Sequence, residues 1–216
     1  MSTDYDWEQW GKQDPYFGVL TNEKYKLEQL TEDAKLEFFK TGEEHVNQVL
    51  KVCQQQFQPG FIPKKGLDFG CGVGRILVPL SKIANTVVGL DVSDSMLNEA
   101  QKNCQKYSTK NNVIFIKSDD DLSGLEEKFD FIHSFIVFQH IPSSRGIHIF
   151  LKLLEHLDSG GIAAIHLVYS KNKFHRNFGI PLVPMAWNFF QNMYQYLRSI
   201  FSRILSMPPM QMNIYD

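Results

Sequence analysis

The residues of this sequence best suited to chemistry are two carboxylates separated by a glycine-rich segment and a helix-length stretch. Residues 66–75 read Gly-Leu-Asp-Phe-Gly-Cys-Gly-Val-Gly-Arg, an apolar run that ends in alternating glycines. A second apolar run, 87–91, ends at Asp91. In an open α/β sheet, glycines let the backbone approach a ligand, and an acid after the next strand can accept both hydroxyls of a ribose. The pattern therefore predicts a site for an adenosine-containing cofactor.

The spacing of the glycines argues against a dinucleotide. The dinucleotide fingerprint would place its third glycine at position 75, where this chain has Arg75. Asp68 is expected at the lip of the loop, where it would repel a pyrophosphate and attract an ammonium group. S-adenosylmethionine carries an ammonium, a carboxylate, a ribose and an adenine but no phosphate. We therefore favour it over a nicotinamide or a flavin.

Four segments in order, residues 68–74, 89–97, 113–119 and 129–135, resemble the motifs of the class I S-adenosylmethionine-dependent methyltransferases, and the resemblance runs from about residue 43 to residue 168. Asp91 looks like the family's ribose-binding acid, and Asp119 resembles the residue that accepts a hydrogen bond from the adenine amino group. The acidic run 119–121 has an alternative interpretation as a solvated loop, or with the register shifted by one residue. With the loop and lid residues, the expected cofactor site comprises Tyr16, Asp68, Gly70, Cys71, Gly72, Gly74, Arg75, Asp91, Val92, Met96, Asp119, Asp120, Ser134 and Phe135. The resemblance implies S-adenosyl-L-methionine as cofactor and S-adenosyl-L-homocysteine as product.

Composition sets the outer limits. With 216 residues, 43% of them hydrophobic, and a formal charge of −2, the chain suits one globular domain, and no basic patch indicates nucleic acid. Cys53, Cys71 and Cys104 are scattered without metal-ligand spacing, so we expect no metal site and a reducing, cytoplasmic location. No segment approaches the about 18 apolar residues of a membrane span, and the amino terminus has no signal-peptide pattern.

Strands and helices alternate along the middle of the chain. We expect strands near 65–69, 87–91, 112–117, 129–134 and 161–168, with helices near 74–83, 94–107 and 143–157 and a turn at 159–161 before the fifth strand. Such alternation predicts an α/β fold, a Rossmann-like, doubly wound and mainly parallel sheet with right-handed crossovers. The resemblance implies the strand order 3-2-1-4-5 and a terminal hairpin of strands six and seven, for which no stretch stands out.

Three regions follow from this organisation. Residues 1–42 form a helical cap or lid that ends at Thr41-Gly42, 43–170 form the cofactor-binding core, and 171–216 form a substrate-side insertion with a helix near 184–205. The chain ends about where the family would begin its last helix, so we expect a shortened chain or a naturally reduced member. A second copy could then cover the open edge of the fifth strand, giving a homodimer.

Methyl transfer from a sulfonium needs little chemistry from the protein. Proximity and orientation supply roughly 7 to 11 kcal/mol, whereas a positioned base adds about 10²- to 10⁴-fold. A catalytic base is therefore optional, and His140, after the fourth strand, is the first candidate; its alternative interpretation is a structural residue that caps the next segment. His133 and His166 are expected to be buried, hydrogen-bonded core residues, and Tyr169 is a weaker candidate for lining the pocket.

Residues 14–20 and Arg75 each have two interpretations. Residues 14–20 are the expected lid, in which Tyr16 and Phe17 either fold over a bound ligand or simply pack the amino terminus onto the sheet. Arg75 either forms a salt bridge to the methionine carboxylate or is an exposed residue of the first helical turn. The functional hypothesis is a methyltransferase acting on a small molecule. The alternatives are a module that binds the cofactor without transferring methyl groups, and a protein methyltransferase.

Overall fold

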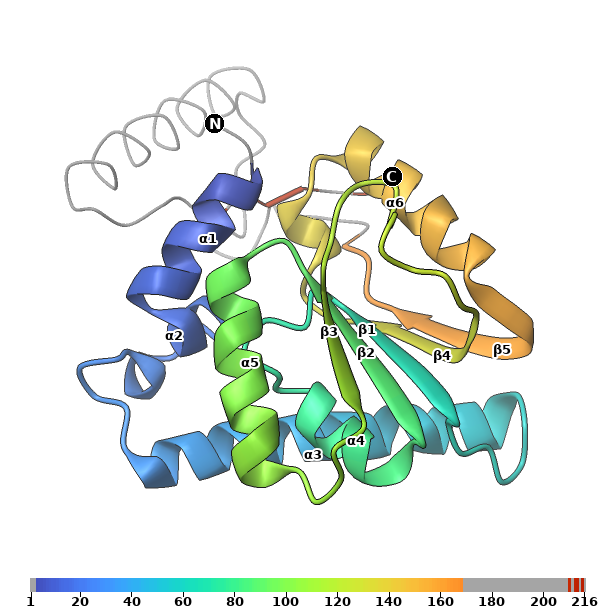
Figure 1. The fold of residues 1–216 in the computed structure, drawn as a ribbon, viewed down its shortest axis with the longest axis horizontal. Coiled ribbons are helices and arrows are strands. Elements are labelled where there is room, and N and C mark those ends of the chain that lie inside the picture. Colours follow the sequence, from blue (N-terminus) through green and yellow to red (C-terminus); the bar gives the residue numbers. More distant parts are fainter. Residues whose placement is uncertain (1–2, 169–209, 211, 214, 216) are drawn as a thin grey trace, which may run out of the picture.

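The computed structural model describes residues 3–168, 210, 212, 213 and 215, so the expected helix at 184–205 and Tyr169 lie outside the described residues. Within them, five parallel strands form one sheet in the order β3-β2-β1-β4-β5, as expected (Figure 1). The strands are β1 (Lys65–Phe69), β2 (Thr86–Asp91), β3 (Val113–Lys117), β4 (Phe129–Ser134) and β5 (Leu157–Ile165). Because all five run the same way, their carboxyl ends meet at one edge of the sheet, where ligands bind in such folds.

Helices cover both faces of this sheet (Figure 1). They are α1 (Thr3–Gln13), α2 (Pro15–Val19), α3 (Glu32–Gln56), α4 (Leu77–Ile83), α5 (Asp94–Tyr107) and α6 (Ser143–Glu155), with 3₁₀ turns η1 (Glu23–Tyr25) and η2 (Phe138–His140). Local signals set two of the starts. The Thr31 hydroxyl accepts the Ala34 N–H at the start of α3, and the Ser93 hydroxyl accepts the Met96 N–H at the start of α5.

Two apolar cores lie between the sheet and the helices, one on each face of the sheet. On one face, α3, α4 and α5 pack on the sheet through fully buried side chains such as Phe38, Leu77 and Val87. On the other face, α6 packs through residues such as Leu67 and Leu153. Alternate strand residues therefore enter opposite cores, which is why the strands read as nearly continuous apolar runs.

The boundary expected at residue 42 is wrong, because α3 runs without interruption from Glu32 to Gln56. Gly42 does not end a helix; it lets α3 cross the turn after the glycine loop. A Cβ at Gly42 would lie 2.1 Å from the carbonyl oxygen of Arg75. The cap and the core thus share one helix.

The turn expected before the fifth strand at residues 159–161 lies within β5 instead, because β5 begins at Leu157 and contains this segment. Gly160 adopts a φ of 77°, and the pairing of β4 with β5 shifts register between Phe129 and Phe131. A glycine with positive φ accommodates such an irregularity without ending the strand.

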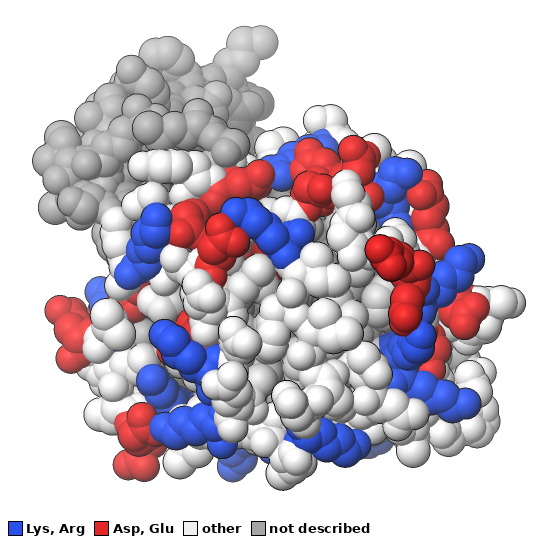
Figure 2. Space-filling view, in the orientation of Figure 1, with Lys and Arg blue, Asp and Glu red and all other residues white. Residues whose placement is uncertain are grey.

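The visible surface carries charges of both signs, interspersed around the face shown in Figure 2. All three cysteines are buried and free. Among the described residues, no helix has the length and apolar character needed to cross a membrane, and no group of three or more His, Cys, Asp or Glu side chains is arranged to hold a metal ion.

Candidate functional site

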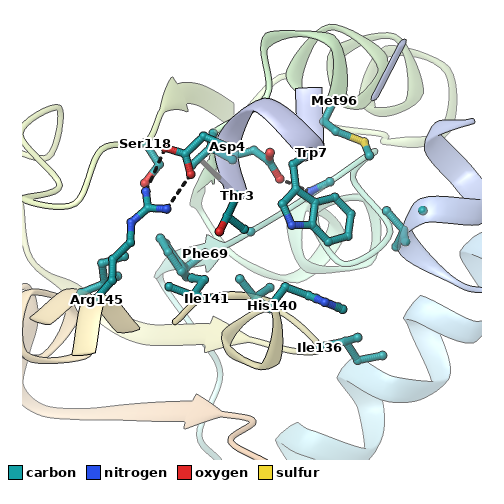
Figure 3. Close-up of a pocket in the computed structure, with 18 of the residues that line it drawn as sticks. Thr3, Asp4, Trp7, Phe69, Met96, Ser118, Ile136, His140, Ile141 and Arg145 are labelled. Carbon is teal, nitrogen blue, oxygen red and sulfur yellow. Dashed lines mark hydrogen bonds and ion pairs between the residues drawn. The ribbon is translucent and has the colours of Figure 1, made fainter. Parts of the chain in front are cut away.

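A cleft opens at the carboxyl edge of the sheet, with α1 forming one wall (Figure 3). It holds about 750 Å³ of empty space, its open mouth included. Its lining consists of Thr3, Asp4, Trp7, Gly18, Val19, Phe69, Gly70, Gly72, Asp91, Val92, Met96, Ser118, Asp119, Asp120, Phe135, Ile136, Val137, His140, Ile141, Arg145 and Ile149. The lining therefore draws on the loops that follow β1, β2, β3 and β4, as the strand-end argument predicts.

The glycine loop needs its glycines for backbone conformation and for space. Gly70, Gly72 and Gly74 all have positive φ, at 74°, 52° and 87°. A Cβ at Gly70 would lie 2.3 Å from a methyl of Val137, and one at Gly72 would lie 2.6 Å from a methyl of Val19. Because Gly70 and Gly72 carry no side chains, the backbone itself forms this wall of the cleft.

Asp91, the last residue of β2, lines the cleft with its carboxylate. Its two oxygens accept the N–H groups of Gly72 at 2.8 Å and Ser93 at 2.9 Å, so the loop and the start of α5 fix its orientation. Burial raises the pKa of Asp91 to about 6, against the lowering effect of these N–H groups. Each oxygen keeps lone-pair capacity for a ligand hydroxyl.

Other predicted residues line the same cleft from neighbouring loops. Val92 and the buried Met96 supply apolar surface beside Asp91. Asp119 accepts the N–H of Ser123 at 2.9 Å, a hydrogen bond that lowers the pKa of its carboxyl group. Asp120 pairs with Arg145, and Phe135 follows β4. Asp119 and Asp120 therefore do line the cleft, although all three carboxylates of the acidic run already have partners within the protein.

Four predicted cofactor residues face the interior of the protein instead of the cleft. Tyr16 is buried, and its hydroxyl contacts Glu99 and Asn103, each at 2.9 Å, so it packs α2 onto α5 and does not line the cleft. Ser134 donates to the Phe69 carbonyl oxygen, joining β4 to β1. Positions 71 and 74 are packing sites too: the Cys71 sulfur lies under the loop against Gly89, and Gly74 faces the Ala100 backbone. The lid interpretation of Tyr16 is therefore wrong.

Asp68 does not lie at the lip of the loop either. It is buried beneath the loop, where its carboxylate accepts a hydrogen bond from Nδ1 of His133 at 2.8 Å. His133 is buried as expected, and its Nε2 lies 2.9 Å from Nε2 of His45. No pattern in the sequence connects these three residues, because only the pairing of β1 with β4 brings Asp68 and His133 together.

Arg75 is buried, which contradicts the interpretation as an exposed residue. Its guanidinium lies 5.7 Å from the ring centre of Phe135, and Nη1 is 3.4 Å from the Thr41 hydroxyl. Among the described residues its Nε has no hydrogen-bond partner. Burial lowers the pKa of Arg75. A buried N–H without a partner is costly unless an acceptor reaches it, and Arg75 is not among the residues that line the cleft.

Helix α1 forms the wall of the cleft described above, which we call its roof. No residue of α1 was predicted to line the cleft. Thr3, Asp4 and Trp7 reach into the cleft from α1, whereas the segment expected to be the lid contributes only Gly18 and Val19 to the lining (Figure 3). The spacing of Thr3 and Trp7, one helical turn apart, was the available signal.

Two sets of contacts hold α1 in place. Glu8 accepts hydrogen bonds from the hydroxyls of Ser93 and Ser95, both at 2.8 Å. Asp4 is bonded by Arg145, which also binds Asp120 across the mouth of the cleft (Figure 3). Burial alone would raise the pKa of Glu8, but these hydroxyls lower it to about 2.

His140, the predicted catalytic residue, lies in the cleft wall on η2. Its ring meets Trp7 edge-on, with ring centres 5.1 Å apart (Figure 3). The neighbouring Ile136 has a φ of 64°, a strained conformation for a β-branched residue. The Tyr215 hydroxyl lies 2.9 and 3.0 Å from the carbonyl oxygens of Phe138 and Ile141, and so holds η2 from outside the cleft.

Comparison with known proteins places this geometry in a family. Residues 67–161 match the family model described as a methyltransferase domain. Over 75 residues the chain is 38% identical to the probable cobalt-precorrin-6B C(15)-methyltransferase (decarboxylating) of Saccharolobus solfataricus, covering 31% of this chain and 38% of that protein. Over 76 residues it is 34% identical to the magnesium-protoporphyrin O-methyltransferase of Synechocystis, covering 35% of this chain and 33% of that protein. These matches span about a third of the length of each curated relative.

Solved structures share the fold. Phosphoethanolamine N-methyltransferase 1 of Haemonchus contortus superposes with a TM-score of 0.60 at 15% identity, covering 78% of this chain and 32% of that chain. Magnesium protoporphyrin IX methyltransferase of Synechocystis superposes with a TM-score of 0.51 at 20% identity, covering 85% of this chain and 77% of that chain. From the matched domain, the glycine loop with its partner Asp91 and the strand order, residues 67–161 form a methyltransferase domain of the class I S-adenosylmethionine-dependent type.

Proposed function

We propose that the protein transfers the methyl group of S-adenosyl-L-methionine to a small molecule, with S-adenosyl-L-homocysteine as the second product. The observation that carries this proposal is Asp91, a buried carboxylate oriented by Gly72 and Ser93 and open to the cleft. It suits a ribose diol, and Val92 and Met96 beside it suit the faces of an adenine. The unsatisfied Nε of Arg75 suits the methionine carboxylate.

The cofactor supplies an activated methyl group, so the protein has to align the acceptor and exclude water. The roof formed by α1 serves the second task. For the first, the cleft lining offers apolar and aromatic surface from Trp7 on α1 and from Phe135, Ile136 and Ile141 after β4. Such a surface suits a small acceptor with an apolar body, and His140 lies beside Trp7 in the same lining.

Calorimetric titration and label transfer test the proposal in two steps. We expect the full chain to bind both S-adenosylmethionine and S-adenosylhomocysteine, and to move a radiolabelled methyl group from the former into a small-molecule extract. Label in the protein fraction instead would identify a protein methyltransferase. Binding without transfer to either fraction would identify a cofactor-binding module, and absence of binding would refute the cofactor site itself.

An Arg145→Met variant is expected to release S-adenosylhomocysteine about tenfold faster, equivalent to about 1.4 kcal/mol. Arg145 bonds Asp4 on the roof and Asp120 on the opposite loop, and both carboxylates are more than one-third exposed, so the effect is moderate. Stopped-flow dissociation measures it. Lys152→Met is the matched control on α6, since Lys152 pairs with the exposed Glu155. Equal dissociation rates in both variants would mean that the Arg145 bridge does not hold the roof closed.

A further inference from the structure

A chain of hydrogen bonds leads from the core of the sheet to helix α3. Asp68 and His133 are register partners on β1 and β4, with side chains 3% and 2% exposed. The Asp68 carboxylate lies 2.8 Å from Nδ1 of His133, and Nε2 of His133 lies 2.9 Å from Nε2 of the half-buried His45. We call these three residues the Asp-His-His relay.

The donors and acceptors of the relay follow from its fixed end. An ionised carboxylate only accepts, so Nδ1 of His133 carries the proton of the first bond. A neutral His133 then has a lone pair on Nε2, and His45 must donate its Nε2–H to it. Nδ1 of His45 is thereby left with a lone pair. The relay orients His45 as a proton acceptor, as a carboxylate does for a catalytic imidazole.

His45 is not itself among the residues that line the cleft, and it adjoins the cleft through Phe135. Its ring lies against Phe135, with ring centres 4.1 Å apart, and Phe135 lines the cleft after β4. The charged and titratable groups around it are Asp68, His133, Arg75 and His166. Burial, followed by the effects of His133, Arg75 and His166, lowers the pKa of His45 to about 4, so His45 is neutral at neutral pH.

Resting on the methyl transfer proposed above, we infer that His45, oriented by Asp68 and His133, is the base that removes the proton of a hydroxyl or amine acceptor. The acceptor's lone pair forms the new bond to the methyl carbon, while the carbon–sulfur bond breaks and its electron pair stays on sulfur. The acceptor proton moves to Nδ1 of His45, and the Nε2 proton of His45 moves to Nε2 of His133. The positive charge then rests on His133 next to the Asp68 carboxylate.

The relay is distinct from the predicted base His140, which lies in the cleft wall beside Trp7. A structural interpretation of the relay, as a buried polar network that fixes the packing of α3 on the sheet, predicts a loss of stability without a specific loss of proton transfer. Rescue by an external base separates the two interpretations, because packing cannot be restored by added imidazole.

The test uses the full chain, radiolabelled S-adenosylmethionine and the small-molecule extract. A His45→Ala variant should lose on the order of 100-fold in transfer rate, bind S-adenosylmethionine as tightly as wild type, and recover activity when imidazole is added. Its rate should also rise with pH as the acceptor loses its own proton. His148→Ala is the control, since His148 is an exposed residue of α6 that pairs with Asp121. Unchanged activity in His45→Ala, or a loss that imidazole does not restore, would overturn the inference.

A second measurement does not depend on the variant folding. Nitrogen-15 spectra of wild-type histidines should show the Nε2–H tautomer for His45 and the Nδ1–H tautomer for His133 at neutral pH; the opposite tautomer of His45 would refute the relay. A wild-type protein that binds the cofactor but transfers no label to the extract refutes the proposed function, and the base role with it. A transferring wild type with an equally active His45→Ala variant refutes the base role alone.

Discussion

A Gly42→Ala variant is expected to be about 3 kcal/mol less stable than wild type, although alanine is the better helix former by about 1 kcal/mol. Gly42 lies inside the 25-residue helix α3, where that preference would normally decide the sign. Here the added Cβ would lie 2.1 Å from the Arg75 carbonyl oxygen and 3.0 Å from its carbonyl carbon. Both are backbone atoms of the turn after the glycine loop, so relief requires moving the helix or the loop.

Urea unfolding followed by circular dichroism measures the effect. Glu43→Ala is the matched control, because the next residue of α3 is exposed and tests helix preference alone. We expect this control to change the free energy of unfolding by less than about 0.5 kcal/mol. A Gly42→Ala protein as stable as wild type would show that α3 does not cross the Arg75 turn at the distance described.

An Asp91→Asn variant is expected to bind S-adenosylmethionine about 100-fold more weakly, or worse. Hydrogen bonds to a charged group contribute about 1.5 to 3 kcal/mol each, and the proposed ribose contact makes two of them. Both Asp91 oxygens already accept backbone N–H groups, so an asparagine also turns an NH₂ group toward one of these donors. Calorimetry measures the affinity, and Asp94→Asn is the control, since Asp94 pairs with Lys117 on the surface.

The same carboxylate predicts how affinity depends on pH. Burial raises the pKa of Asp91 to about 6 in the free protein. The ionised form accepts ribose hydroxyls better, so ligand binding should lower this pKa, and affinity should rise with pH up to about 7 and then level off. The Asp91→Asn profile should be flat through that range. An unchanged slope in the variant would assign the pH dependence to another group.

Elements with their own start signals were predicted closely from the sequence. Helix α5 matches the expected bounds because Ser93 caps it and an apolar strand precedes it. The strands β1 and β4 match because each is a short apolar run between polar breaks. These boundaries are set by interactions between residues close together in the sequence, which residue types and their spacing predict.

The errors come from contacts between distant segments. Gly42 looks like a helix breaker until the Arg75 turn is placed beside it. Tyr16 looks like a lid residue until its hydroxyl meets Glu99 and Asn103 on α5. Asp68 looks free for a ligand until the register of β1 and β4 sets it beside His133. Each correction depends on packing at large sequence separation, which residue types alone do not encode.

The placement of Trp7 gives the protein an optical reporter of its own. Its indole lies in the cleft wall in edge contact with His140, whereas Trp10 is buried in the core beside Phe17. A molecule that fills the cleft changes the polarity around Trp7 and leaves Trp10 untouched. The sulfonium of the methyl donor carries a positive charge that the thioether of the product lacks. The fluorescence of Trp7 can therefore report occupancy and turnover in real time, without a label on the acceptor.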